Sequence, residues 1–557
     1  MKKSLALKAF MFCSSLLITA TACSSTGIVR TTESYNFNEK KDIAGKIVVD
    51  LSKKGQTIDR AFYGSHLDSF SQPPPANLVQ ELGIGRIRIG GNEYDVFNWK
   101  NNLSYTKTGV HNLLGLGGIA ALLREYKVGG IYQINLSGYQ PVLEGNSVLL
   151  KNSFTAADAY EMIKVLNGQL KLGITDISLG NEPEQWHETH PHTKAYTEDS
   201  GISADEYIER YIAFAVAVRQ AQEENTGDAN SIKIWGPEIS SSWLDWNTGN
   251  FTKDCQWSPT VRGQVECKYG EDGSFTHFIP YFLNRLAKAE KDPAVNPKGY
   301  KLLDNFAFHY YPNFRTKIDD VNSIVKDAEG RQWVSKILEG TRLLHDPTYT
   351  NTIDISSYRN ANPNIIPRMK GWLKSYYPNA KLVINEFAVD SDWRSNTYHP
   401  IIRPLYIADT LGIAAKEGVS FFNNFALSNK EGSNIPWAML DGGTKKTNNF
   451  HTYALYTNHF KGTMVATEDN MGDVVNAYAT AGAQYVNVAI VNKSPADRTV
   501  QIYVKNGNAR KVATYVVPGW STSILKLEQN PSRFAKGFEV NKFGAEQMGI
   551  AKDTNYK

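Results

Sequence analysis

The sequence lacks several features that would indicate common classes of protein. It has no segment rich in lysine and arginine, and its formal net charge is only +4 over 557 residues. Because binding to nucleic acid depends on concentrated positive charge, nucleic acid is not expected as a partner. After the first 25 residues no apolar run is long enough to cross a bilayer. No internal repeat or low-complexity tract stands out.

What the chain does contain is an ordinary globular composition. Hydrophobic residues make up 41% and aromatic residues 11%, enough for a large core and for a cleft lined by Trp and Tyr, on which sugars stack. The length exceeds one ordinary domain of roughly 100–200 residues. We therefore expect one large domain and a smaller one.

The N-terminal segment has the layout of a secretory signal. Lys2 and Lys3 precede an apolar stretch over 9–20, and the short sequence ATAC, which ends at Cys23, resembles a bacterial lipobox. We predict a signal peptide over 1–22, a lipidated Cys23 and a flexible tether over 23–44. The protein would then be exported and anchored to the outer membrane or cell surface by its lipid alone. Ordinary cleavage near Ala22 is the alternative.

Cysteine is scarce, and the remaining residues of this type favour one disulfide. Cys13 leaves with the signal, whereas Cys255 and Cys267 share one polar segment. Because exported proteins meet oxidising conditions, we predict that these two form a disulfide. A metal pair is the weaker alternative, since the spacing does not fit the zinc-knuckle types.

Short apolar strands alternate with amphipathic helices over most of the chain, which is typical of parallel βα units. Ser203 and Glu206 form a capping-box pattern at the start of one such helix. Eight units in series predict an α/β fold, a (β/α)₈ TIM barrel over 61–446. Long loops after the fifth and sixth strands lie on the face where barrel enzymes keep their active sites. The predicted strands are 62–68, 85–91, 129–136, 174–180, 232–238, 305–311, 381–387 and 419–425.

The pattern changes near residue 447. Polar and apolar residues then alternate between Asn, Gly and Pro turns, as in antiparallel strands. We predict a β-sandwich over 447–530, joined by N-terminal strand residues over 45–60. The tail over 531–557 has no strong pattern.

Two glutamates follow barrel strands at positions that suggest catalysis. Glu182 comes just after the fourth strand and Glu386 ends the seventh, so the two carboxyls face each other across the barrel mouth. Such a pair is what acid/base cleavage of a glycosidic bond requires. Asn181 is well placed to bond a sugar hydroxyl. A solvated carboxylate at a strand end is the alternative for either residue alone.

Five stretches around and between these glutamates form a recognisable set: RIGGNEYDVFNWKNN (88–102), NEPEQWHETHP (181–191), FHYYP (308–312), HDPTY (345–349) and PRMKGWLKSYYPNAKLVINEF (367–387). In this order they resemble glycoside hydrolase family 44, which cleaves β-1,4-glucans and xyloglucan internally and combines a barrel with a β-sandwich. The resemblance covers nearly the whole mature chain.

The resemblance implies roles for several residues. Glu182 is implied to be the general acid/base and Glu386 the nucleophile of a retaining mechanism. Trp99 would be a sugar platform, while His309 and Tyr311 would lie beside the nucleophile. Strand alternation favours Tyr311 over Tyr310 as the inward-facing tyrosine.

Some positions depart from the family pattern and alter the cleft walls. Gly180 stands where Asp is usual, Glu93 where Arg is usual and His345 where Trp is usual. Trp393, with Asp390 and Asp392, is also unusual and is a further candidate sugar contact. Asn92 is another, with a hydrogen-bonded turn as its alternative.

The histidines near Glu182 raise the question of a metal site. His187, His190 and His192 do not form the HExxH pattern, and Pro191 prevents one clean helix, so a structural loop is favoured and no metal or cofactor is expected. A structural calcium is left open. Trp186 is taken as packing or cleft wall, and Trp437 and Trp520 as core.

We expect a monomer that acts on a polysaccharide. Two other hypotheses remain: an exo-acting hydrolase of the β-xylosidase or arabinofuranosidase type, and a non-catalytic glycan-binding lipoprotein.

Overall fold

Eight parallel strands form a closed barrel in the computed structural model, which describes residues 45–69, 71–190, 202–240, 255–257, 265–312, 328–350, 363–389, 401–430, 437–529, 532–543 and 547–554. Each predicted strand is present, and the last pairs with the first to close the cylinder. The (β/α)₈ barrel is therefore confirmed. Its strands are β2 (Tyr63–Leu67), β3 (Arg86–Ile89), β6 (Gly129–Ile134), β9 (Asp176–Leu179), β10 (Lys233–Ile239), β13 (Asn305–Tyr310), β14 (Lys381–Phe387) and β15 (Phe422–Asn424).

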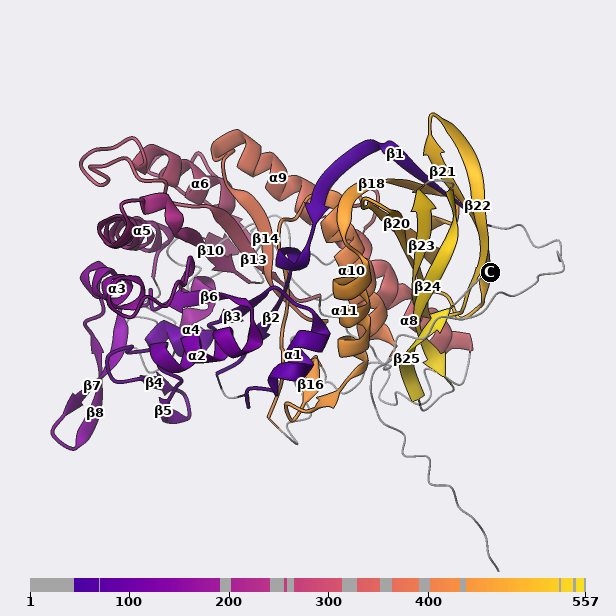
Figure 1. Ribbon diagram of the computed structural model, residues 1–557. Coiled ribbons are helices and arrows are strands. Elements are labelled where there is room, and N and C mark those ends of the chain that lie inside the picture. Colours follow the sequence, from indigo (N-terminus) through magenta and orange to yellow (C-terminus); the bar gives the residue numbers. More distant parts are fainter. Residues whose placement is uncertain are drawn as a thin grey trace, which may run out of the picture.

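Helices surround the barrel (Figure 1). The predicted capping box begins α5, where the Ser203 amide donates to Glu206 Oε2 at 2.8 Å and the Glu206 amide donates to Ser203 Oγ at 3.2 Å. In the described residues, no helix combines the length and apolar character needed to span a membrane. The principal helices are α1 (Ala76–Leu82), α2 (Leu116–Tyr126), α3 (Ala156–Ile163), α5 (Ala204–Thr226), α6 (Phe278–Ala289), α8 (Ala328–Glu339), α9 (Ile365–Tyr376), α10 (Ile402–Glu417) and α11 (Asn448–His459).

Short hairpins extend some of the barrel loops. One of them, β11 (Cys255–Trp257) with β12 (Val265–Cys267), carries the two cysteines of the predicted disulfide. Cys267 is disulfide-bonded, and Cys255 stands directly opposite it in the hairpin register. The other hairpins are β4 (Leu103–Thr106) with β5 (Gly109–Asn112), β7 (Tyr139–Glu144) with β8 (Ser147–Asn152), and β16 (Leu440–Asp441) with β17 (Lys445–Lys446).

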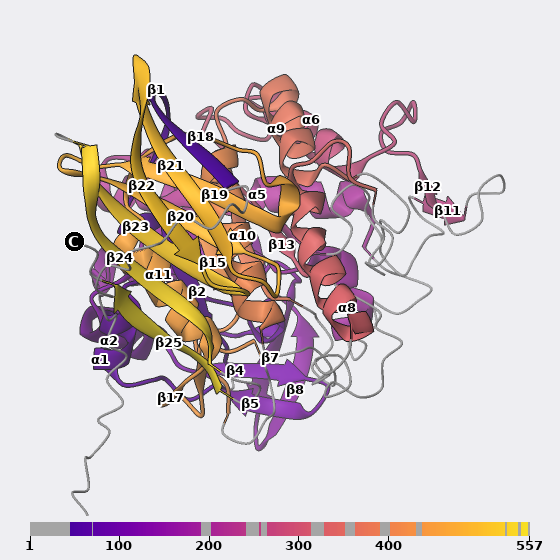
Figure 2. The ribbon, with the colours of Figure 1, turned by 90° about the vertical axis from the view of Figure 1, so that its right-hand side faces the viewer.

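A second domain is built on a nine-stranded sheet beside the barrel (Figures 1 and 2). Strand β1 lies between β18, to which it is antiparallel, and β21, to which it is parallel, so the predicted joining of the N-terminal strand is confirmed. The other neighbouring pairs are antiparallel. The strands are β1 (Gly45–Ile58), β18 (Gly462–Asp469), β19 (Val475–Ala481), β20 (Tyr485–Asn492), β21 (Arg498–Asn506), β22 (Asn508–Val517), β23 (Ser521–Gln529), β24 (Ser532–Phe543) and β25 (Gln547–Thr554).

The two faces of this sheet bury different neighbours. In β19, Ala477 and Ala479 belong to the domain's own core, whereas Tyr478 between them belongs to the core shared with the barrel. This follows from strand geometry, because successive side chains point to opposite faces. A Cβ on Gly412 of α10 would lie 2.1 Å from the Tyr478 ring, so only glycine permits this close approach of helix and sheet.

The structure differs from the predicted domain limits at two places. Helix α11 falls within the range assigned to the sandwich, but it packs on the barrel, where the Tyr453 hydroxyl donates to the Gly64 carbonyl of β2 at 2.7 Å. The range 531–557 contains strands β24 and β25, which extend the sheet beyond β23. A helix that ends a barrel gives no signal of its domain in its own sequence, and the tail over 531–557 has no strong hydrophobic pattern although β24 pairs with both β23 and β25.

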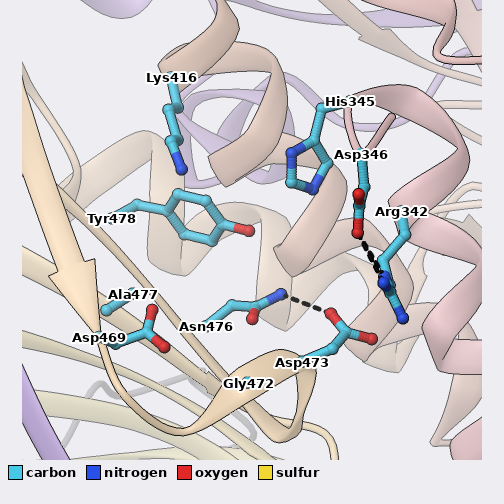
Figure 3. Close-up of a pocket in the computed structure, with 10 residues that line it drawn as sticks. All are labelled: Arg342, His345, Asp346, Lys416, Asp469, Gly472, Asp473, Asn476, Ala477 and Tyr478. Carbon is cyan, nitrogen blue, oxygen red and sulfur yellow. Dashed lines mark hydrogen bonds and ion pairs between the residues drawn. The ribbon is translucent and has the colours of Figure 1, made fainter. Parts of the chain in front are cut away.

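A buried ion cluster and a cavity lie where the two domains meet. Lys493, just after β20, is 3% exposed, and its Nζ lies 3.0 Å from Asp409 Oδ2 of α10 and 2.5 Å from Asp473 Oδ1. The adjoining cavity of about 500 Å³ brings side chains of both domains together, as Figure 3 shows. His345, one of the departures from the family pattern, lines this cavity and not the barrel mouth.

Candidate active site

Glu182 and Glu386 converge at the carboxyl end of the barrel. Glu182 follows β9 in a left-handed conformation (φ 39°), and Glu386 lies on β14. One carboxylate oxygen of each, together with a ring nitrogen of His309, lie within 4.8 Å of one another. Their side chains are 14% and 6% exposed, so the pair is largely withdrawn from water.

His309 lies between the two glutamates. In the register of β13 and β14 it stands opposite Glu386. Its Nδ1 lies 2.8 Å from Glu182 Oε1 and 3.5 Å from Glu386 Oε2. Its Nε2 lies 3.0 Å from a third carboxylate, that of Glu238. Three carboxylates therefore surround one fully buried imidazole ring.

Arg88 and Tyr311 complete the surroundings of Glu386. Arg88 on β3 is fully buried and forms an ion pair with Glu386 Oε1, while its Nη2 donates to Asn181 Oδ1 at 2.8 Å. The Tyr311 hydroxyl donates to Glu386 Oε2 at 2.5 Å. Tyr310 points the other way, with its hydroxyl 2.9 Å from that of Tyr406. The inward-facing tyrosine is thus Tyr311.

These surroundings push the pKa values of the two glutamates apart. Burial raises the pKa of Glu386, but the positive charges of His309 and Arg88 outweigh it and lower that pKa to about 2. Burial raises the pKa of Glu182, and the hydrogen bond from His309 opposes this without cancelling it. Burial lowers the pKa of His309, yet the surrounding carboxylates, Glu386 first, raise it to about 10. The constellation holds one carboxylate ionised and favours the protonated form of the other.

A second layer of buried polar groups fixes Asn181. Its Nδ2 donates to Asn92 Oδ1 at 2.9 Å, and its amide donates to Asp95 Oδ1 at 2.9 Å. The indole of Trp186, 1% exposed, donates to Asp95 Oδ2 at 3.1 Å. Trp186 therefore packs beneath the site. Burial raises the pKa of Asp95 well above its usual value.

The other predicted residues lie away from the two glutamates or outside the described residues. Trp99 is half-buried and packs against the main core, so its part as a sugar platform stays a prediction. Trp437 and Trp520 are both buried, in line with their expected place in the core. Cys23, His192, Asp390, Asp392 and Trp393 lie outside the described residues, as do the side chains of His187 and Glu188.

The histidine-rich loop places one described ring inside the protein. His190 is 1% exposed, with Nε2 3.4 Å from Asp95 Oδ2, and burial lowers its pKa to about 3. This neutral ring contacts Asp95, which in turn accepts from the Asn181 amide. In the described residues, the donor group close enough for a metal ion is Glu182, His309 and Glu386, whose charges already balance against one another and against Arg88.

Sequence reasoning missed two charged residues of the site, Arg88 and Glu238. Both are fully buried strand residues, and a charged residue inside an apolar strand was the available signal. Glu93, which stands where the family has Arg, is half-buried, and burial with the nearby charge of Asp68 raises its pKa to about 7. Gly180 has φ +75°, a left-handed conformation that disfavours the Asp usual in the family.

Comparison with known proteins agrees with the motifs. Residues 139–314 match the profile of glycoside hydrolase family 44. The resemblance to this family is confirmed. Endoglucanase A of Paenibacillus lautus is 24% identical over 387 residues, a stretch that covers 65% of this chain and 49% of that enzyme. The chain thus spans about half the length of this relative.

Solved structures of family-44 enzymes share the fold. A Paenibacillus polymyxa xyloglucanase of the family, solved with xyloglucan, superimposes with a TM-score of 0.62 at 18% identity and covers 86% of this chain and 98% of its own. A family-44 endoglucanase from Clostridium acetobutylium gives a TM-score of 0.63 at 19% identity, with 86% and 99% covered. At these identities the likeness establishes the barrel with its second domain.

Proposed function

We propose that the protein is a retaining glycoside hydrolase that cleaves internal β-1,4 bonds of a plant β-glucan or xyloglucan. The observation that carries the proposal is the contrast between two close carboxyl groups. Glu386 is held ionised by Arg88 and His309, whereas burial favours a proton on Glu182. A nucleophile and a proton donor are what the first step requires.

The proposed reaction has two steps. Glu386 attacks the anomeric carbon while Glu182 gives its proton to the departing sugar oxygen, which leaves a covalent glycosyl-enzyme. Glu182 then takes a proton from water, the water oxygen attacks the same carbon, and Glu386 departs. Retaining enzymes place their carboxyl groups about 5–5.5 Å apart, and inverting enzymes need about 6.5–9.5 Å to admit the water. Oxygens within 4.8 Å of each other support retention.

The substrate class rests on the relatives. The Paenibacillus lautus relative is an endoglucanase, and the P. polymyxa structure holds xyloglucan. The site also has amide groups near the acid/base, since Asn181 and Asn92 bond each other above β9 and β3. Both are suited to sugar hydroxyls. We further propose that the chain acts outside the cytoplasm, because its first residues have the layout of a lipoprotein signal.

Two substitutions test the roles of the glutamates. Glu386→Ala should abolish hydrolysis of xyloglucan and carboxymethyl-cellulose. Glu182→Gln should lose about 10²–10⁴-fold on polymers and far less on aryl glycosides, whose leaving group needs little protonation. The matched control is Glu184→Gln, because Glu184 bonds Ser240 and not the catalytic pair. Burial raises the pKa of Glu184 to about 7, so glutamine resembles its protonated form.

Product analysis tests the mode of cleavage. We expect a mixture of oligosaccharide lengths from the preferred polymer, and a first-formed anomer of unchanged configuration by proton NMR. A panel of β-glucans, xyloglucan, mannans and xylans identifies that polymer. Release of single sugars alone would favour the exo-acting type, and wild-type rates in both glutamate variants would overturn the assignment.

A further inference from the structure

Glu238, at the end of β10, is a third carboxylate behind the catalytic pair. Its side chain is fully buried. It has three partners from three other barrel strands: Ser178 Oγ donates to Oε1 at 2.5 Å, Asn385 Nδ2 donates to Oε1 at 2.8 Å, and His309 Nε2 lies 3.0 Å from Oε2. The two neutral donors carry no compensating charge. Burial raises the pKa of Glu238, and the positive charges of Arg88 and His309 outweigh it and lower that pKa.

The main chain of Glu238 also reaches the site. Its carbonyl accepts from the Glu182 amide at 3.0 Å, and like Glu182 it has a left-handed backbone (φ 59°). Backbone outliers of this kind persist where the surrounding structure enforces them, often at active sites. Asn385, one of its partners, directly precedes Glu386. Glu238 therefore bonds the main chain of Glu182 and the side chain of the residue before Glu386, and it does not lie between the two catalytic carboxyls.

A buried carboxylate needs a cationic partner, because an isolated charge in the interior is very costly. Among the described residues, His309 is the ionisable cation in contact with the Glu238 carboxylate. Its ring can balance that charge only with protons on both nitrogens. A proton on Nε2 that is held by Glu238 leaves Nδ1–H for the opposite side of the ring, where Glu182 and Glu386 lie.

We propose that Glu238 is a positioning residue that keeps His309 a doubly protonated imidazolium, whose Nδ1–H is shared by Glu182 and Glu386. This inference rests on the proposed function. The fixed charge suits both steps: it stabilises Glu386 while that group is the free nucleophile, and it stabilises Glu182 once that group has given its proton to the leaving oxygen.

The charges around His309 agree with this role. The ionised Glu238 and Glu386 favour the imidazolium, and an oxygen of Glu182 lies 2.8 Å from its Nδ1. Arg88 and the neutral His66, both beside Glu386, do not favour it. The Tyr311 hydroxyl donates to Glu386 and stays protonated, because burial raises its pKa well above the usual value. The carboxyl groups around the ring, Glu386 first, outweigh the cost of burying it and raise the pKa of His309 to about 10.

Nitrogen NMR of the full chain with labelled histidine tests the inference without any substrate. The His309 signals, assigned by their loss in His309→Asn, should show two protonated nitrogens between about pH 5 and about pH 9 in the wild type. In Glu238→Gln, which keeps the shape but removes the charge, His309 should lose a proton within that range. Ser178→Ala removes one hydrogen bond and no charge, and Glu184→Gln removes a carboxyl that does not contact His309. Both should leave the His309 signals as in the wild type.

The kinetic test is the pH profile of kcat/KM. Because His309 is still protonated at the low pH where Glu386 ionises, the acidic limb in Glu238→Gln should stay in place. The alkaline limb should move down to the pH at which His309 loses its proton, a change that loss of packing alone would not cause. A singly protonated His309 in the wild type at neutral pH would overturn the inference, even if Glu238→Gln failed to fold. So would unchanged His309 signals in a folded Glu238→Gln. If the wild type hydrolysed no β-glucan, the proposed function would fail while the NMR result still decided the state of His309.

Discussion

Tyr311 donates its hydroxyl to Oε2 of Glu386 at 2.5 Å, while its neighbour Tyr310 turns away to Tyr406. The two adjacent tyrosines are thus a natural pair of variants. Tyr311→Phe removes a hydrogen bond to a charged group, a bond that favours the ionised nucleophile. We expect kcat to fall about tenfold or more, since such bonds contribute about 1.5–3 kcal/mol.

Tyr310→Phe is the control for this prediction. It should cost about 1 kcal/mol of stability through the lost bond to Tyr406 and leave kcat near the wild-type value. Kinetics on a soluble β-glucan and thermal melts of both variants measure the two effects. Equal losses of kcat in the two variants would contradict a specific part for Tyr311.

Acid should remove the stabilisation that comes from ionised Glu386. Its folded pKa of about 2 lies below the ordinary value of 4.5, so its contribution is complete above pH 4.5 and disappears as pH falls toward 2. The stability of the wild type relative to Glu386→Gln should therefore decrease by up to about 3 kcal/mol over that interval. Urea unfolding at several pH values measures the difference.

Glu184→Gln provides a control of opposite sign. The folded pKa of Glu184 is raised to about 7, so its contribution is complete below pH 4.5 and is lost as pH rises through 7. The wild type should lose stability relative to this variant between those values. The same slope in both variants would refute the assigned directions.

The buried Lys493 should be needed for stability rather than for catalysis. Lys493→Met leaves Asp409, which is fully buried, with neutral donors alone, and breaking such a pair costs about 3–5 kcal/mol. Lys505→Met removes a 44% exposed partner of Asp50 and should cost less than about 1 kcal/mol. Denaturant midpoints test both, and kcat at room temperature should stay unchanged. Figure 3 shows the cavity beside this cluster.

Lipidation of Cys23 is tested by cell fractionation. Cys23→Ser should move the protein from the membrane fraction to the soluble exported fraction, whereas Cys13→Ser should leave it anchored. A wild-type protein that is already soluble, with its N-terminus just after Ala22, would show ordinary cleavage instead.

The barrel was predictable because each strand carries its own signal. The stretch KLVINEF, for example, is an apolar run with Glu386 near its end, and counting strands placed that residue opposite Glu182. Arg88 and Glu238 were not predicted, because their partners lie far away in sequence: Arg88 contacts a residue 298 positions later and Glu238 one 71 positions later. A local pattern marks such residues as unusual but does not identify the charge that balances them.

Domain limits were harder for the same reason. Nothing in the sequence of α11 distinguishes a barrel helix from one in the next domain, whereas the bonds of its Tyr453 hydroxyl to β2 and β15 place it on the barrel. Strand β1 was assigned correctly because its strand-like sequence precedes the first strand of the barrel.

Strand β1 threads between β18 and β21, and its Lys46 amide donates to the Asn470 side chain, 424 positions away. During synthesis this first strand must therefore wait, unpaired, until the whole barrel has emerged from the ribosome. A shortened chain that begins at residue 60, made to isolate the barrel, would lack an interior strand of the neighbouring sheet. An exchange of that sheet for another domain must therefore replace β1 together with β18 to β25.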